Sequence, residues 1–222
     1  TVLKGIGVTA ALPLLDAMLP ASTAMAQSAA LAQRTRYGAL YIPHGKTMAK
    51  WTAFPYDLYA FDAAKVKKQW ARLHAGDLEP TPKDAKVLDA WALFHAGEFQ
   101  KAYDAGLKAA STGNSGGITV ANKAQSIYAN YLEKSEKTKL ALFMEVAERA
   151  EAQLADDPKN ANAYYFLAYA LGRYSQGISV AKALAQGLGA KVKSSLETAI
   201  KLQPKHADAY IALGTFHAEV ID

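Results

Sequence analysis

Apolar and polar residues follow a helical period over most of the chain from residue 62 onward. Stretches with apolar residues three or four positions apart are separated by short polar breaks, and the period-two alternation of a half-buried strand is missing after residue 60. The pattern predicts an all-α body over residues 62–222, with helices near residues 121–134 and 136–155. Residues 111–117, which read STGNSGG, are expected to form an irregular break before that pair.

Two segments in the second half of the chain open in the same way, Pro158–Ala161 with the sequence PKNA and Pro204–Ala207 with the sequence PKHA. After each alanine, an aromatic residue, a leucine and a small residue follow at the same distances. They are Tyr164, Leu167 and Ala168 in the first copy, and Tyr210, Leu213 and Gly214 in the second. Together with Gly97–Ala102 and Leu196–Pro204, this register resembles the tetratricopeptide repeat over about residues 83–222. The resemblance implies a solenoid of stacked helical hairpins that binds a protein or peptide.

The two equivalent prolines are 46 residues apart, whereas a standard repeat of this class has about 34 residues. We expect the excess to lie in residues 174–190, as an extended or broken helix that packs on a neighbour. The body should then contain three helical hairpins and the first helix of a fourth.

The register also predicts which side chains are buried between stacked helices and which stay solvated. The predicted core contacts are Tyr164, Leu167, Ala199, Tyr210 and Leu213, and the predicted solvated residues are Lys159, Lys201 and Lys205. A near-zero loss of stability on truncating Leu167 to alanine would show that the register is misplaced.

In repeats of this class the first helix of each hairpin lines a concave groove. The residues that we predict to bind a partner there are Trp91, His95, Asn162, Tyr165, Tyr169, Arg173, Asp208 and Thr215. Tyrosine, tryptophan and arginine are the usual anchors of protein interfaces. Tyr165, Tyr169 and Arg173 recur every four residues and so share one helix face, which suits an extended segment of acidic character. The alternative is that these residues only pack on neighbouring helices or are covered by residues 174–190.

The first part of the chain has a different character. Residues 5–21 are mostly apolar and are followed by Ala24-Met25-Ala26, which is typical of a secretory leader with its cleavage site. We interpret residues 1–26 as a signal-like leader or membrane anchor, and residues 27–61 as a linker with a short strand at 37–42. Residues 1–52, with their leader and the segment YIPHG at 41–45, resemble the start of exported bacterial DUF1552 proteins, and this resemblance implies a periplasmic or envelope location.

Composition and charge exclude several classes of function. Apolar residues make up 51% of the chain and charged residues 20%, which favours a globular body. The net charge of +5 is concentrated in residues 1–52, which carry +4, so that the remainder carries only +1. A nucleic-acid partner is therefore not expected, because such a partner would need a basic stripe on the folded body.

No motif supports catalysis, a cofactor or a metal ion. The chain has no cysteine, and no two of its five histidines are three or four residues apart. Gly113–Gly117 matches the nucleophile-elbow pattern, but it follows a predicted helix instead of a strand, so we interpret it as a polar loop. Gly45-Lys46-Thr47 lacks the upstream glycine of a phosphate loop, because that position is Leu40.

The sequence therefore predicts an exported, non-enzymatic helical-repeat scaffold that binds a protein or peptide in its concave groove. The alternative is a fragment or subunit of an exported enzyme, or of an envelope complex that residues 1–26 anchor to a membrane. The change of character near residues 52–56 is also compatible with a fusion of two unrelated segments.

Overall fold

Ten α-helices account for the regular secondary structure of the residues that the computed structural model describes, which are residues 61–221. The helices are α4 (Ala63–Lys68), α5 (Trp70–Leu73), α6 (Ala85–His95), α7 (Phe99–Ser111), α8 (Gly116–Tyr131), α9 (Glu136–Asp156), α10 (Ala161–Gln176), α11 (Val180–Ala185), α12 (Leu188–Leu202) and α13 (Ala207–Ile221). The predicted all-α body is confirmed over this range. The leader, the linker up to residue 60 and the strand predicted at 37–42 lie outside the described residues.

Local capping explains where several helices begin. The side chain of Asn160 accepts a hydrogen bond from the backbone N–H of Ala163 at 2.9 Å, and Asp84 accepts from the N–H of Lys86 at 2.8 Å. Each cap satisfies a backbone donor that the first helical turn leaves free. Helices α10 and α13 begin at Ala161 and Ala207, the two positions that the repeated sequence segments mark as equivalent.

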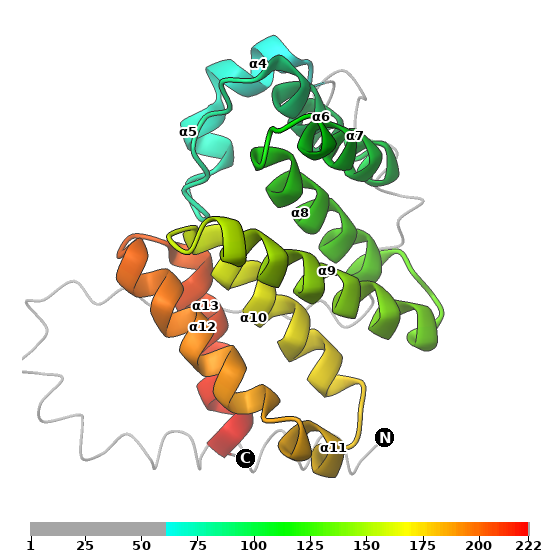
Figure 1. Cartoon of the computed structure of the whole chain (residues 1–222), viewed down its shortest axis with the longest axis vertical. Coiled ribbons are helices and arrows are strands. Elements are labelled where there is room, and N and C mark those ends of the chain that lie inside the picture. Colours follow the sequence, from blue (N-terminus) through cyan, green and yellow to red (C-terminus); the bar gives the residue numbers. More distant parts are fainter. Residues whose placement is uncertain (1–60, 222) are drawn as a thin grey trace, which may run out of the picture. The chain divides into compact units, whose positions relative to one another are not determined.

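The helices form three antiparallel hairpins followed by one further helix, as the sequence predicts. The hairpins are α6 with α7, α8 with α9, and α10 with α12, and α13 packs on α12 and α10. Figure 1 shows them following one another along the molecule in nearly sequential order. The excess residues after Tyr174 form the end of α10, the short helix α11 and the start of α12.

Helix α8 begins at Gly116, earlier than the predicted start near residue 121, so the irregular break before it is shorter than expected. The reason is the close approach of α7 and α8. A Cβ atom added to Gly106 would lie 2.6 Å from the carbonyl oxygen of Gly117, and one added to Gly117 would lie 2.3 Å from that of Gly106. Gly117, which the sequence assigns to an irregular break, is therefore part of a tight helix–helix contact.

Two apolar clusters hold the stack together. One includes Trp70 and Trp91 and joins α4, α5, α6, α7 and α8, and the other joins α8, α9, α10, α12 and α13. Leu167 and Ala199 are buried as predicted, and Tyr164 and Leu213 are partly buried against the second cluster. Lys159, Lys201 and Lys205 are exposed, as predicted.

The prediction for Tyr210 is wrong, because half of its surface (50%) is exposed. In the predicted register this tyrosine would contact the next helix of the stack. No described helix packs on that side of α13, so the ring faces outward.

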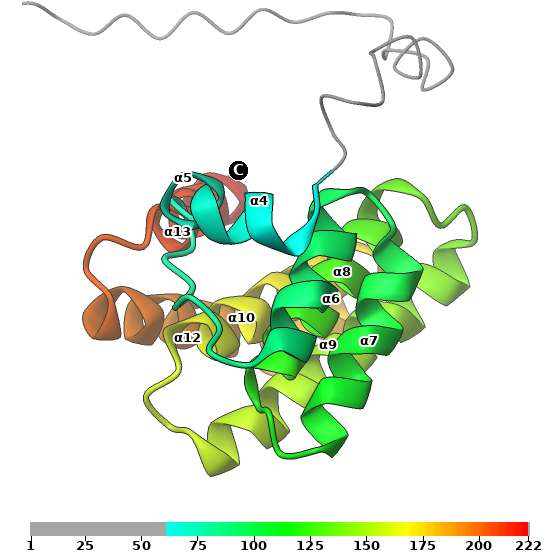
Figure 2. The same ribbon diagram turned by 90° about the horizontal axis from the view of Figure 1, so that it is seen from above.

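The first helices of the hairpins, α6, α8 and α10, together with α13, form one side of the stack, which we call the inner face. Figure 2 shows the short helices α4 and α5 on the side of the stack away from α7. Residues 75–83, which connect α5 to α6, run along this inner face, and we call them the strap. Their contacts are the starting point for the functional site.

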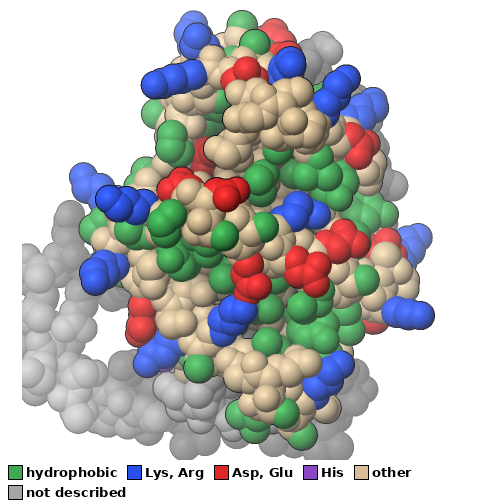
Figure 3. All heavy atoms as spheres, viewed as in Figure 1, with side chains coloured by type: hydrophobic (Ala, Val, Ile, Leu, Met, Phe, Trp, Pro, Cys, Tyr) green, Lys and Arg blue, Asp and Glu red, His purple; other side chains and the backbone are tan. Residues whose placement is uncertain are grey.

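The opposite surface carries charges of both signs. Figure 3 shows lysine, arginine and acidic side chains interspersed over the visible face, with no continuous basic stripe. None of the described helices combines the length and the apolar character needed to span a membrane.

Truncating a core leucine should test the packing between the hairpins. Leu167 is 4% exposed, so Leu167→Ala should lower the free energy of unfolding by about 2–5 kcal/mol, because it removes buried apolar contacts and leaves a cavity. Urea denaturation measures this value. Leu184→Ala is the matched control, since Leu184 is 75% exposed and should change stability by less than about 0.5 kcal/mol. Equal losses for the two variants would contradict the assigned core.

Candidate functional site

The strap lies on the inner face and is bound there mainly through its backbone. The carbonyl of Gly76 accepts from the backbone N–H of Asp208 in α13 at 3.2 Å. The carbonyl of Leu78 accepts from the side-chain amide of Gln203 at 3.2 Å, and that of Glu79 accepts from the indole N–H of Trp70 at 2.7 Å. The strap therefore connects the two ends of the described stack.

Asp77 is the central side chain of the strap and is 3% exposed. Its carboxylate accepts from Nδ1 of His74 at 3.0 Å, from the backbone N–H of Glu79 at 3.2 Å, and from the Lys123 ammonium in α8. Burial by itself raises the pKa of Asp77, but the hydrogen bond from His74 and the charge of Lys123 outweigh it. The pKa of Asp77 is therefore held well below its ordinary value, and the group is a stable buried anion.

Beside Asp77, the fold brings together two histidines that are far apart in the sequence. Nε2 of His95 in α6 lies 3.3 Å from Nε2 of His74. Because Nδ1 of His74 donates to Asp77, Nε2 of a neutral His74 ring can accept a hydrogen bond from the Nε2–H of His95. Burial, followed by the neighbouring His74 and Lys123, lowers the pKa of His95 to about 4.

A second chain of hydrogen bonds starts at Glu79 and runs across the inner face. Nδ2 of Asn162 in α10 donates to the Glu79 carboxyl group at 2.6 Å, and Oδ1 of Asn162 lies 2.9 Å from Nε2 of His206. Nδ1 of His206 accepts from the backbone N–H of Ala209 at 3.2 Å, so Nε2 is the donor to Asn162. Burial lowers the pKa of His206, which keeps its ring neutral as this chain of hydrogen bonds requires.

Glu79 differs from Asp77 in its charge balance. Burial is the main influence on this group, and with the nearby Asp77 carboxylate it raises the pKa of Glu79 to about 8, against the opposing effects of Asn162 and Lys123. Two carboxyl groups two residues apart therefore have their pKa values shifted in opposite directions, because only one of them contacts the lysine directly.

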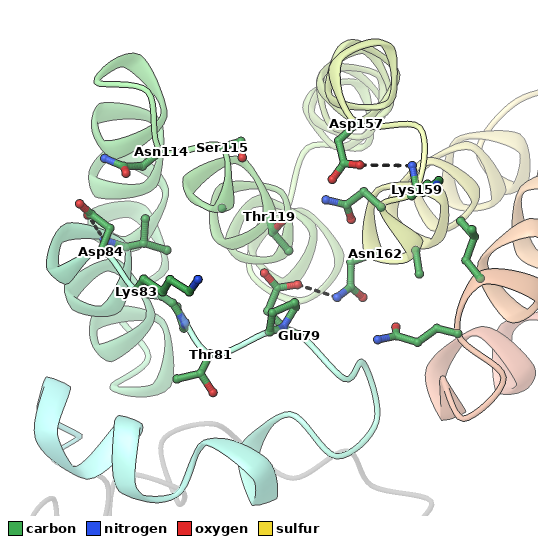
Figure 4. Close-up of a pocket in the computed structure, with 18 of the residues that line it drawn as sticks. Glu79, Thr81, Lys83, Asp84, Asn114, Ser115, Thr119, Asp157, Lys159 and Asn162 are labelled. Atoms are coloured by element: carbon green, nitrogen blue, oxygen red, sulfur yellow. Dashed lines mark hydrogen bonds between the residues drawn. The ribbon is translucent and has the colours of Figure 1, made fainter.

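The inner face has two hollows, and residues 79–83 of the strap line the first of them. The first, of about 540 Å³, is polar and lies between the strap and the N-terminal ends of α8 and α10. Figure 4 shows Glu79 and Asn162 pointing toward each other at one side of this polar hollow, with Lys83 and Asp84 on one wall and Asp157 and Lys159 on another.

The second hollow, of about 510 Å³, lies among α10, α11, α12 and α13 and is more apolar. Its walls include Leu196 of α12 and the outward-facing Leu184 and Ile211, which are 75% and 68% exposed. Asp208 lines it at the side of the strap, where the carboxylate lies close to Gly76. We call this the apolar hollow.

Tyr165, Tyr169 and Arg173 all line the apolar hollow and come from one face of α10, as their four-residue spacing predicts. The guanidinium of Arg173 lies 5.4 Å from the centre of the Tyr169 ring, and its Nη1 donates to Gln176 at 3.1 Å. The ring of Tyr165 lies 6.1 Å from that of Tyr169. No carboxylate within the described residues forms a salt bridge with Arg173.

Of the other predicted groove residues, some line the apolar hollow and the rest are covered by other parts of the fold. Asp208 and Thr215 line the apolar hollow. Trp91 is fully buried and Asn162 is 3% exposed, so neither offers a free surface. Trp91 is covered by α5, whose Trp70 ring meets it edge-on at 5.7 Å, and His95 is engaged by His74. The prediction for these three positions is corrected, because the strap and α5 cover the part of the inner face that they line.

Residues 174–190 border the apolar hollow without filling it. Ala183, Leu184 and Gly189 line its margin, while Tyr165, Tyr169 and Arg173 all stay partly exposed. The excess segment therefore leaves these three side chains partly exposed, and their role in binding stays a prediction.

The sequence analysis missed the strap and its partner Lys123. The available signal was in α8, where Lys123 is the one charged residue in a mostly buried helix. A buried lysine requires a carboxylate partner, and the sequence does not indicate which one. The described residues hold no group of three or more side chains suited to a metal ion, and the His74–His95 pair has no third ligand there.

Comparison with known protein families finds a family model that matches this chain. The profile of a family described as regulator of microtubule dynamics protein 1-3 matches residues 88–222, which is more than half of the chain. The chain belongs to this family. The match begins within α6 and includes the later helices that form both hollows. No curated protein and no solved structure matches the chain.

Replacing Glu79 should change how stability depends on pH. Folding raises the pKa of Glu79 from 4.5 to about 8, so the folded chain binds this proton more tightly than the unfolded chain. The contribution of Glu79 to stability is therefore full below about pH 4.5 and is lost as the pH rises toward about 8. Between these values, the free energy of unfolding of the unaltered protein should fall relative to that of Glu79→Gln.

Urea denaturation at several pH values measures this difference. Glu148→Gln, at an exposed position of α9, is the matched control and should follow the unaltered protein. Parallel curves for the Glu79→Gln variant and the unaltered protein would show that Glu79 is not protonated in the folded chain.

Proposed function

We propose that this protein is a non-enzymatic helical-repeat scaffold that binds a segment of a partner protein on its inner face. The observation that carries the proposal is the arrangement of Tyr165, Tyr169 and Arg173, which line one hollow beside the exposed Ile211. Aromatic and arginine side chains around an apolar pocket are the usual anchors of protein interfaces.

The chemistry of the hollow favours a partner segment with an apolar side chain and a carboxylate. Leu196 and Ile211 offer apolar contact area. Arg173 is held in place by Tyr169 and Gln176 and can pair with an incoming carboxylate. The family description concerns the regulation of microtubules, which are protein assemblies, and so is consistent with a protein partner.

Site-specific photo-crosslinking tests this function. A photoreactive phenylalanine analogue placed at Ile211 should capture a partner protein in cells that make this chain. The same analogue at Tyr131, which is 70% exposed and does not line the hollow, is the control and should not capture it.

Arg173→Ala should lower the crosslink yield at Ile211 by about tenfold or more, as expected for a central arginine anchor. Identical adducts at both positions, or a yield that Arg173→Ala does not change, would count against the proposal.

We also propose that the protein is exported, on the basis of the leader-like residues 5–21 and the segment Ala24-Met25-Ala26. The alternative is that residues 1–26 stay attached and anchor the protein to a membrane. Mass spectrometry of the protein from a native host should find a new N-terminus after Ala26. An intact leader on membrane-bound protein would favour the anchored form, and recovery of the intact chain from the cytoplasm would contradict export.

A further inference from the structure

The strap is bound in the way that an extended peptide is bound by a receptor. Three of its backbone carbonyls accept hydrogen bonds from other elements, and its two acidic side chains, Asp77 and Glu79, reach α8 and α10. These contacts join residues that are 46, 83 and 125 positions apart in the sequence. The inner face therefore already holds one acidic, irregular segment, which belongs to the chain itself.

The receiving surface is suited to a carboxylate. The side chain of Lys123 is 20% exposed, and in the described part of the chain its salt bridge is with Asp77. A half-buried cation between α6 and α8 is costly unless an anion faces it. Asn162 and Gln203 add amide donors from two further elements. A segment that takes the place of the strap must bring a carboxylate to Lys123.

The strap can leave this surface without opening the cores. None of residues 75–83 belongs to either apolar cluster, whereas the flanking Trp70 and Val87 do. The strap has no helix, and Leu78 holds a positive φ of 49°, which is unfavourable for a side chain with a Cβ atom. Hydrogen bonds and the Lys123–Asp77 salt bridge hold this strained segment, which lies outside both apolar clusters, while apolar packing holds the helices on both sides of it.

We propose that the strap is a built-in ligand of the inner face, and that an acidic, extended segment of a partner protein binds in its place. The incoming carboxylate pairs with Lys123, and the incoming backbone takes the hydrogen bond of Gln203. Displacing the strap removes residues 79–83 from one wall of the polar hollow, and it frees Asp208, which lines the apolar hollow and lies against Gly76. This inference rests on the inner face being a binding surface, but it concerns a different part of that face.

The strap competes with any such partner because it is part of the same chain. A tethered segment acts at an effective concentration in the millimolar range, so a free peptide binds weakly while the strap is in place. Weakening the strap without altering the receiving side chains should therefore reveal the site.

The experiment uses a fluorescent synthetic peptide with the sequence of residues 74–83, HAGDLEPTPK, and the full chain. Fluorescence anisotropy should give a dissociation constant at least about tenfold lower for Asp77→Asn than for the unaltered protein, because the variant strap loses its charge for Lys123. Adding Lys123→Ala to Asp77→Asn should remove this gain. A peptide with asparagine and glutamine in place of its two acidic residues should bind the Asp77→Asn variant at least about tenfold more weakly.

A disulfide lock provides a second, independent arm. The Cβ position at Gly76 lies 3.1 Å from Cγ of Asp208, so cysteines at both positions are close to bridging distance, and the chain has no other cysteine. When Gly76→Cys and Asp208→Cys are combined with Asp77→Asn, the oxidised protein should not bind the peptide, and reduction should restore binding.

Equal affinity for the unaltered protein and Asp77→Asn, equal binding of the neutral peptide, or binding that oxidation does not block would each overturn the proposal. Arg173→Ala, placed in the Asp77→Asn protein, should leave the peptide affinity within about twofold. A failure of the crosslinking at Ile211 and a failure of the peptide experiment are therefore distinguishable.

Discussion

The buried carboxylate of Asp77 is the interaction on which the organisation of the inner face depends. A buried anion is tolerated only when hydrogen-bond donors and a cation surround it. Its donors come from His74, which directly follows α5, from the strap itself, and from Lys123 in α8. Because all three must be in place, they fix the path of the strap, whose residues 79–83 line the polar hollow.

The stack of hairpins supplies the surface that this anion organises. Close packing between α7 and α8 rests on Gly106 and Gly117, and the second core combines alanines with larger apolar side chains such as Phe166 and Leu196. Small residues at helix contacts let the first helices of successive hairpins lie side by side. The apolar hollow follows from this arrangement, since α10 and α13 flank it and α11 closes one margin.

The part of the inner face under the strap and the apolar hollow differ in polarity, but each presents a cation, Lys123 in the first and Arg173 in the second. Lys123 already holds a carboxylate of the same chain, whereas Arg173 forms no salt bridge within the described residues. Both cations are held in position by aromatic neighbours, Lys123 over Trp91 and Phe94, and Arg173 over Tyr169. This shared placement of a cation beside aromatic rings is why we propose acidic segments as ligands for both parts of the face.

Most of the fold and part of the site could be predicted from the sequence. The paired segments at Pro158 and Pro204 carry local signals, so the starts of α10 and α13 and the burial of Leu167 follow from periodicity and capping. The strap has the composition of an ordinary loop, and its partners lie far away along the chain, so no local pattern indicates it. The sequence assigns Trp91 to the groove because its position in the helix faces inward. It is buried only because α5 covers it in the folded chain, and no local pattern indicates that contact.

Hydrogen exchange at the backbone amide of Asp208 tests most directly whether Asp77 organises the inner face. This N–H lies in the first turn of α13, where the helix offers it no partner, and it donates to the carbonyl of Gly76 in the strap. Asp208 has no hydrogen bond with Asp77, so the amide reports on the strap alone. In the Asp77→Asn protein, the account predicts that the Asp208 amide exchanges at least about tenfold faster while the amides in the middle of α7 keep their rates. An unchanged rate at Asp208 would contradict the account.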